Sequence, residues 1–245
     1  MQSADASLKR KFNFLLYYTI ISSSLFLFFM LSSFNEKDKT LKLDEITVKK
    51  MSLIGEDGSL RMVISNETRQ HPGRMKGIDL PKRERPSGII FFNNQGDECG
   101  GIIAKVTPEK NATNSGMSFT MDNYHDDQVI QILNDETYEN GKAEIQRGLF
   151  INEFPLGTDV ISRVAKFEEI EKIKDPKEKK EKMDELREKE GSKRRLFVGR
   201  KSNNDTGIFL YDSKGKPKMK IYVDKDGSAK IEVIDAEGKA KNIVQ

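Results

Sequence analysis

The sequence predicts a mainly β protein, an antiparallel meander of hairpin repeats, with an inserted helical hairpin and one N-terminal transmembrane helix. Three observations support this fold class. An uncharged apolar run covers residues 12–34. Short apolar and alternating segments, separated by glycine-containing turns, make up most of the remaining chain. One stretch between them, residues 156–192, follows a helical period instead.

The N-terminal run is long enough to cross a membrane, because at about 1.5 Å per residue it reaches about 34 Å, against about 30 Å of hydrocarbon. Lys9, Arg10 and Lys11 precede it, and the charges that follow nearly cancel. The positive-inside rule therefore places residues 1–11 in the cytoplasm and the body on the other side of the membrane, in a periplasmic or extracytoplasmic location. The alternative is a cleaved signal peptide, but its apolar region spans only about 7–15 residues. We expect an uncleaved signal-anchor.

The first β half is expected at residues 41–155, after a short polar tether at 35–40. Alternation at 41–48 indicates a strand, and segments 51–53 and 60–64 flank the hairpin turn around Asp57-Gly58. Two further hairpins are expected, 89–92 with 100–103 and 117–121 with 129–133. Cys99 is the only cysteine, so no disulfide within the chain contributes to stability.

The C-terminal meander, residues 193–245, has turn glycines at Gly215, Gly227 and Gly238. This spacing, about one strand plus a tight turn, predicts antiparallel neighbours. Met219, Ile221 and Val223 alternate with polar residues and Tyr222, which indicates one buried face and one wet face, so that the apolar face needs a cover. The segment 224–227 resembles a calcium loop only superficially and is interpreted as a turn, because later ligands are missing.

The helical insertion, residues 156–192, is expected to begin at a cap formed by Thr158 or Asp159. Proline at position 176 restricts the residue before it and predicts two helices rather than one. The second, 177–190, is charged and is interpreted as an exposed spacer arm, with a partner-binding coiled coil as the alternative. The expected buried stripe of the first helix is Val160, Val164, Phe167, Ile170 and Ile173.

A long proline-containing loop at 68–88 is the best candidate for binding an anion, since long ordered loops are often functional and arginine forks fit phosphate or carboxylate. The candidate residues are Arg69, His71, Arg74, Lys76, Lys82, Arg83 and Arg85. The alternative is a solvated loop whose arginines pair with acids such as Asp97 and Glu98 of the next hairpin. We favour this alternative, because the argument for a site depends on loop length and charge alone.

No catalytic motif is present, so we expect no catalytic residue, no cofactor and no enzyme activity. A hydrolase using Cys99 with His71 or His125 is the weakest alternative. Asp122 with residues 125–127 could ligate a metal, but this composition is typical of a hairpin turn and lacks the spacing of zinc sites, so no metal is expected. The formal net charge is only +3, which disfavours nucleic acid as a partner.

Several strings in the chain resemble a group of uncharacterised bacterial hypothetical proteins, many of which begin with a comparable membrane segment. These strings are MVISN (62–66), RQHPG (69–73), GIIFFN (88–93), GDECGG (96–101) and RLFVGR (195–200). The resemblance covers roughly residues 44–240 and implies a bacterial envelope, in which Asn66, Asn111 and Asn204 are not glycosylated. It implies no activity, and therefore no catalytic residues.

These observations together predict a single-pass protein of the bacterial inner membrane that displays a non-catalytic scaffold or protein-interaction module. Self-association is expected, because a meander leaves two free strand edges. The first alternative is a binding domain for anionic envelope ligands, such as a phosphorylated sugar or a lipid headgroup, that uses loop 69–85. The second is the hydrolase described above.

Overall fold

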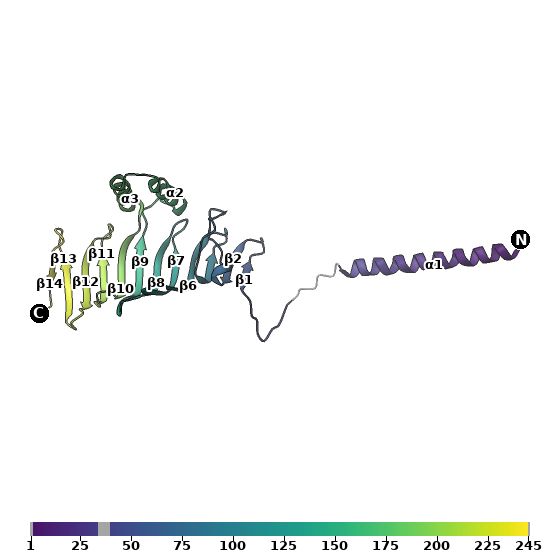
Figure 1. The fold of residues 1–245 in the computed structure, drawn as a ribbon, viewed down its shortest axis with the longest axis horizontal. Coiled ribbons are helices and arrows are strands. Elements are labelled where there is room, and N and C mark those ends of the chain that lie inside the picture. The colour runs from purple at the N-terminus through teal and green to yellow at the C-terminus, as the bar shows by residue number, and fades with distance from the viewer. Residues whose placement is uncertain (1, 34–39, 245) are drawn as a thin grey trace. The chain divides into compact units, whose positions relative to one another are not determined.

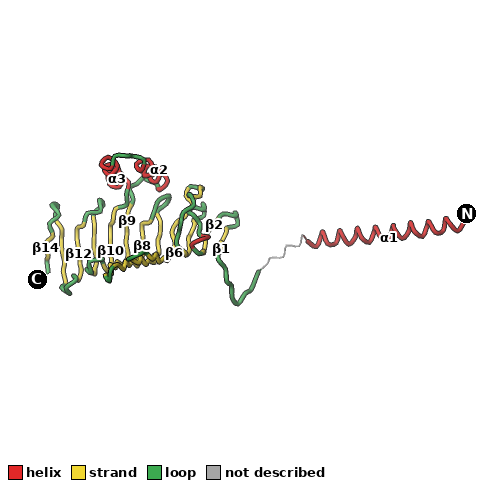
Figure 2. Tube along the Cα trace, viewed as in Figure 1, coloured by secondary structure: helices red, strands yellow, loops and turns green. Residues whose placement is uncertain are grey.

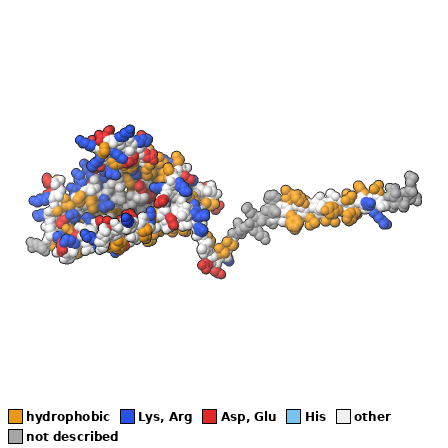
Figure 3. Space-filling model, in the orientation of Figure 1, with side chains coloured by type: hydrophobic (Ala, Val, Ile, Leu, Met, Phe, Trp, Pro, Cys, Tyr) orange, Lys and Arg blue, Asp and Glu red, His pale blue; other side chains and the backbone are white. Residues whose placement is uncertain are grey.

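The computed structural model describes residues 2–33 and 40–244, and the chain divides into two units, Met1–Thr47 and Val48–Gln245. The predicted tether, 35–40, lies outside the described residues except for Thr40, as does Phe34 at the end of the predicted span. In the first unit, α1 (Gln2–Ser33) contains one segment, Ser7–Ser32, that is long and apolar enough to cross a membrane. Hydrophobic side chains line it, and basic side chains lie near its N-terminal end (Figure 3). A membrane anchor and a signal sequence both have these properties.

The second unit is built on one twelve-stranded antiparallel sheet, in the order β1-β2-β5-β6-β7-β8-β9-β10-β11-β12-β13-β14 (Figure 1). Its strands are β1 (Lys50–Ile54), β2 (Leu60–Ser65), β5 (Ser87–Phe92), β6 (Glu98–Pro108), β7 (Ala112–Asp122), β8 (Gln128–Glu139), β9 (Lys142–Glu153), β10 (Lys193–Arg200), β11 (Thr206–Tyr211), β12 (Pro217–Val223), β13 (Ala229–Ile234) and β14 (Ala240–Asn242). The mainly antiparallel β fold class is thus confirmed. The two β halves expected from the sequence are one continuous sheet, because β9 pairs with β10 from Glu153↔Lys193 to Arg147↔Arg200.

The same tight turn joins the strands of seven hairpins, at residues 55–59, 93–97, 123–127, 201–205, 212–216, 224–228 and 235–239. In each, the first residue donates its N–H to the carbonyl of the fifth, and the fourth donates to the carbonyl of the first. Gly215 and Gly227 occupy the fourth position with φ of 76° and 87°, which glycine adopts without strain. Asp212 and Asp224 accept backbone N–H bonds at the first position, which explains the recurring acids at the ends of these strands.

The strand predicted at 41–48 is wrong, because residues 40–49 form no strand and β1 begins only at Lys50. The reason is the lack of a partner. β2 ends at Ser65, which pairs with Lys50, and after one more hydrogen bond, from the Asn66 N–H to the Lys49 carbonyl at 3.3 Å, no described strand pairs with residues 40–48. Alternation alone does not make a strand when no neighbouring strand can satisfy its backbone groups.

One face of the sheet carries the core and is called the core face. Its buried side chains form two clusters, one of Val63, Ile90 and Phe92 and the other of Phe150, Phe197 and Phe209. In the second cluster the rings stack, with centroids 4.6 Å apart between the first pair and 5.6 Å between the second. Gly148 and Gly199 lie beside Phe150 and Phe197 on the same face. An added Cβ on Gly148 would lie 2.5 Å from the Phe197 ring, so the ring occupies the space that glycine leaves.

The opposite face, called the ladder face, carries two rows of apolar side chains that cross the sheet from β1 to β13. Paired residues share a face, so the rows follow from the register. The first row is Met51, Ile64, Ile89, Ile102, Phe119, Ile132, Leu149, Val198, Ile208, Ile221 and Ile231. The second is Leu53, Met62, Phe91, Gly100, Met121, Ile130, Ile151, Leu196, Leu210, Met219 and Val233.

The expectation that Met219, Ile221 and Val223 point to the buried face is wrong. Ile221 and Val223 are 40% and 45% exposed, and no side chain of the ladder rows is buried. The core instead lies on the face of Lys220, since Lys220 pairs with Phe209. Alternation identifies the apolar face correctly, but it does not show whether the chain itself supplies a layer to cover that face.

The inserted helical hairpin consists of α2 (Val160–Glu171) and α3 (Pro176–Glu190), located at the end of the strands between β9 and β10 (Figure 2). Asp159 caps α2 by accepting the Ser162 N–H at 2.9 Å. The predicted apolar stripe is wrong at Val164, which is 46% exposed, whereas Arg163 is buried. Basic and acidic side chains intermingle over this hairpin (Figure 3), as its charged sequence predicts.

Candidate functional site

The candidate site is built around the basic loop, residues 66–86, which connects β2 to β5 and folds over the core face. It begins with a short 3-10 helix, η1 (Glu67–Arg69), and contains the two-stranded hairpin β3 (Arg74–Met75) and β4 (Ile78–Asp79). The ring of His71 packs edge-on against buried Phe92, with centroids 4.9 Å apart. Burial lowers the pKa of His71. The loop therefore supplies the cover of the first core cluster.

Most of the basic side chains in this loop have partners within the protein. Arg85 makes a two-pronged pair with Glu98 at 2.7 and 2.8 Å, and Arg74 donates to Asp79 at 2.6 Å. Lys76 lies 3.1 Å from Asp159, the cap of α2. These pairs match the solvated-loop alternative, in which the arginines pair with neighbouring acids.

The other candidate residues for anion binding are Arg69, His71, Lys82 and Arg83, and no close ion pair in the described part of the protein holds their side chains. Arg83 donates to the Pro72 carbonyl at 3.2 Å. Among the described residues, the side chains of Arg69 and Lys82 make no ion pair. His71 accepts the Gly73 N–H at Nδ1, so this nitrogen is occupied within the loop. Anion binding by the loop stays a prediction, and Arg69, Lys82 and Arg83 are the side chains left to carry it.

Three carboxyl groups converge on the core face beside Arg85: Glu98 on β6, Asp122 at the end of β7 and Asp127 in the following turn. Burial, followed by the charges of Glu98 and Asp127, raises the pKa of Asp122 to about 7. Its Oδ1 is buried without a hydrogen-bond partner among the described residues. Burial also raises the pKa of Asp127 and of the Cys99 thiol. A cluster of carboxyl groups with raised pKa values is typical of functional sites, although structural networks also produce it.

The carboxylate cluster predicts a pH-dependent stability. Folding raises the pKa of Asp122 from 3.8 to about 7, so the folded state binds a proton that the unfolded state releases between these values. Stability from this group is therefore present at low pH and is lost as pH rises towards 7, by on the order of 4 kcal/mol in total. We expect Asp122→Asn to unfold at higher denaturant than the parent at pH 8 and to lose less stability between pH 5 and pH 8.

Urea unfolding of both proteins at the two pH values measures this effect. Asp127 acts in the same direction, whereas the lowered pKa of His71 acts in the opposite one below about pH 6.5. The comparison with Asp122→Asn measures Asp122 together with its interaction with the Asp127 charge, and the contribution of His71 is common to both proteins. Equal changes in stability with pH for the two proteins would contradict the assignment.

A second network links the tip of the basic loop to the helical hairpin. Asp97, which is 2% exposed, accepts the Gly77 N–H at 3.0 Å and lies 3.2 Å from Nε2 of His125. In the next turn, Asp126 forms a buried ion pair with Arg163 of α2. The sequence gives no signal for this pairing, since the two residues are distant in the chain.

The hydrolase alternative uses Cys99, His71 and His125, and each of these residues has its own surroundings. Cys99 has a raised pKa, which keeps its thiol protonated near neutral pH, while His71 and His125 are engaged by Gly73 and Asp97. Within residues 2–33 and 40–244, no group of three or more His, Cys, Asp or Glu side chains is arranged to hold a metal ion. The turn expected at 123–127 is present. The absence of enzyme activity stays a prediction, with catalysis by these residues as its alternative.

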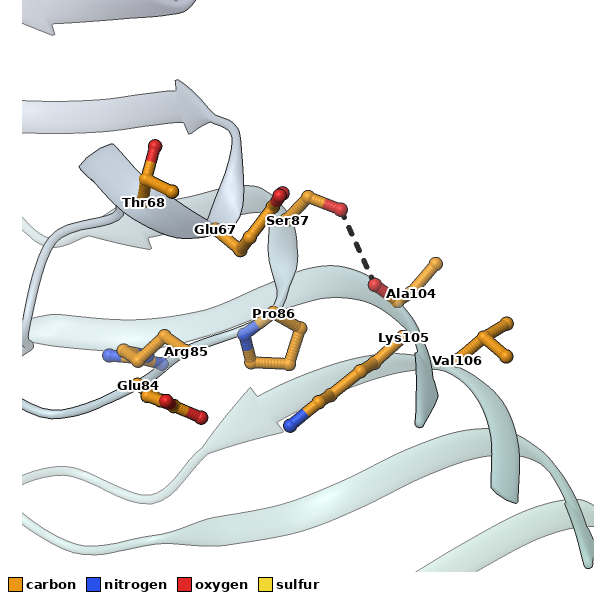
Figure 4. A pocket seen from close by; sticks show the side chains of 9 residues that line it. All are labelled: Glu67, Thr68, Glu84, Arg85, Pro86, Ser87, Ala104, Lys105 and Val106. Carbon is orange, nitrogen blue, oxygen red and sulfur yellow. Dashed lines mark hydrogen bonds between the residues drawn. The ribbon is translucent and has the colours of Figure 1, made fainter. Parts of the chain in front are cut away.

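A pocket of about 420 Å³ opens where η1 and the end of the basic loop meet β6 (Figure 4). Its lining residues are Glu67, Thr68, Glu84, Arg85, Pro86, Ser87, Ala104, Lys105 and Val106. The Ser87 hydroxyl donates to the Ala104 carbonyl at 3.4 Å at one end. The lining holds two acidic and two basic side chains, so it has no net charge to select an anion.

No protein-family model, no curated protein and no solved structure matches this chain. The structure has the β-rich body and the one apolar N-terminal helix expected from the sequence, and the resemblance to bacterial proteins stays a prediction.

Proposed function

We propose that this protein is a membrane-anchored interaction module of a bacterial envelope, which displays its β body outside the cytoplasm and binds a protein partner there. The observation that carries the proposal is the ladder face. In the described residues, twenty-one apolar side chains cross eleven strands, and neither the basic loop nor the helical hairpin covers them. Exposed apolar patches larger than a few hundred Å² mark sites of protein or membrane interaction.

The anchor supports the location. α1 is apolar over Ser7–Ser32, and the basic residues Lys9, Arg10 and Lys11 lie at its N-terminal end. Under the positive-inside rule the N-terminus faces the cytoplasm and the body lies on the other side. Covering the apolar face is favourable, because it removes apolar side chains from water.

Two measurements on the full-length chain test the proposal. Protease added to sealed spheroplasts should digest the body and spare an epitope placed before Lys9. A photo-reactive residue at Ile221 on the ladder face should form protein adducts in intact cells, whereas the same residue at Glu237, in an exposed turn, should not. A protected body or the absence of adducts at Ile221 would count against the proposal.

A further inference from the structure

We propose that the partner of the ladder face is a second copy of this chain, so that two sheets pack face to face and the two rows of apolar side chains interdigitate. The inference rests on the proposed function, because it names the partner of the same face. It begins from the contrast between the two faces. Phe150, Phe197 and Phe209 on the core face are 0–1% exposed, whereas Ile132 and Leu53 on the ladder face are 54% and 55% exposed.

Within the second unit, neither of the two described elements outside the sheet covers this face. The basic loop packs on the core face, where His71 contacts Phe92. The helical hairpin is held at the strand ends by Arg163 and Asp126, and α3 has only Leu186 as a buried residue. Both elements that could have formed a second layer are therefore committed elsewhere.

The size of the face fits a dimer. Eleven strands spaced about 4.8 Å apart give a strip about 50 Å long, and two rows of side chains make it about 14 Å wide. Its area is about 700 Å², close to the roughly 800 Å² that each partner contributes to a standard protein interface. A small ligand would cover only a fraction of such a strip.

The chemistry of the face fits a copy of itself. Aliphatic side chains dominate both rows, and charged side chains begin beside them: Arg147, in the row next to the first, pairs with Glu136 at 2.5 Å, and Glu153, next to the second row, pairs with Arg195. This is an apolar centre with a polar rim, as in stable interfaces. Sheets with the same strand spacing interdigitate about 10 Å apart, as the two layers of a β-sandwich do. Anchoring to one membrane also holds copies at the same height and raises their effective concentration.

A two-fold axis between the sheets makes the contact reciprocal, so residues near the centre of the strip meet their own counterparts. Ile132 lies on the sixth of the eleven strands that form the ladder. We expect the full-length chain with Cys99→Ala and Ile132→Cys to form a disulfide-linked dimer in native membranes under mild oxidation. Ile78→Cys in the same background is the matched control, because Ile78 is 62% exposed and lies outside the ladder face. It should remain monomeric.

A second pair of variants measures the association itself. Ile132→Lys should halve the native mass of the purified full-length protein, whereas Ile78→Lys should leave it unchanged, and circular dichroism should show the same β content in both. No cross-link at Ile132→Cys, or a native mass unaffected by Ile132→Lys, overturns the proposal.

The outcomes also separate this inference from the proposed function. Adducts at Ile221 with a different protein, without a cross-link at Ile132→Cys, overturn the second copy but leave an interaction module. No adduct of any kind overturns both. Binding of a monomer to vesicles of phosphatidylethanolamine and phosphatidylglycerol that Ile132→Lys abolishes would assign the face to a lipid surface, and would overturn the dimer.

Discussion

Replacing Asp126 by alanine is expected to lower the free energy of unfolding by about 3–5 kcal/mol, because it leaves the Arg163 guanidinium buried without its counter-charge. Asp126 is 1% exposed and Arg163 is 5% exposed. The pair is two-pronged, with one Arg163 nitrogen 3.2 Å from Oδ2 of Asp126. The same carboxylate accepts the Thr158 hydroxyl at 3.1 Å, and Arg163 also donates to the Glu190 carbonyl at 3.4 Å. One ion pair thus ties both ends of the helical hairpin to the sheet.

Denaturant unfolding of the full-length protein measures the loss. Asp226→Ala is the control, because Asp226 lies in a turn of the same hydrogen-bonding pattern but is exposed, and within the described part of the chain its side chain pairs only with Lys225. We expect it to change stability by less than about 0.5 kcal/mol. The double variant Asp126→Leu with Arg163→Met should be less destabilised than Asp126→Ala, since it leaves no unpaired charge. Similar small losses for Asp126→Ala and Asp226→Ala would show that the pair does not hold the hairpin.

The sequence predicts the sheet well because the signals for it are local. A tight turn needs only a few residues, and glycines such as Gly215 and Gly227 identify it through their backbone conformation. The break between the two helices is equally local, since Pro176 acts on its own predecessor. The predictions that proved wrong concern features that depend on a neighbouring part of the chain. Residues 41–48 alternate, yet no strand lies opposite them.

Alternation could not show which face of the sheet is buried. A period of two residues indicates which side chains share a face, but it does not indicate which face is covered. The core forms on the side where the phenylalanine rings lie beside Gly148 and Gly199. At Gly199, φ is +151° and an added Cβ would lie 2.0 Å from the Arg147 carbonyl oxygen. These glycines belong to strands rather than turns, and only the register shows that they are neighbours.

The candidate site was predictable in composition but not in arrangement. Loop length and charge identify residues 69–85, and the pairing of Arg85 with Glu98 follows the alternative weighed from the sequence. The carboxylate cluster could not be foreseen in the same way. A shift in the register of β7 and β8, which skips Val129 of β8, places Asp122 opposite Gln128, and such irregularities leave no local pattern in the sequence.

Replacing Phe197 by alanine is expected to destabilise the protein by about 3–5 kcal/mol, the range for removing a fully buried aromatic ring from a core. Phe197 is 0% exposed and stacks between Phe150 and Phe209. Arg194 lies over the Phe150 ring at 4.7 Å and Lys201 over the Phe209 ring at 3.8 Å, so cationic side chains shield the two outer rings. Without the central ring, Phe150 loses its stacking partner and Phe209 keeps only the tilted ring of Tyr222 at 5.8 Å, and Gly148 and Gly199 have no side chain to fill the cavity.

Urea unfolding of the full-length protein tests this prediction against Tyr124→Ala, which removes an aromatic side chain that is 64% exposed in a turn. The control should lose less than about 1 kcal/mol, mainly its ring contact with His125 and its hydrogen bond to Gln95. If Phe197→Ala loses much more stability than Tyr124→Ala, the hydrophobic core that stabilises each chain lies on the core face. The ladder face is then free to serve association. A small loss for Phe197→Ala would instead mean that the ladder rows hold the fold, and that their cover is needed before the chain can fold at all.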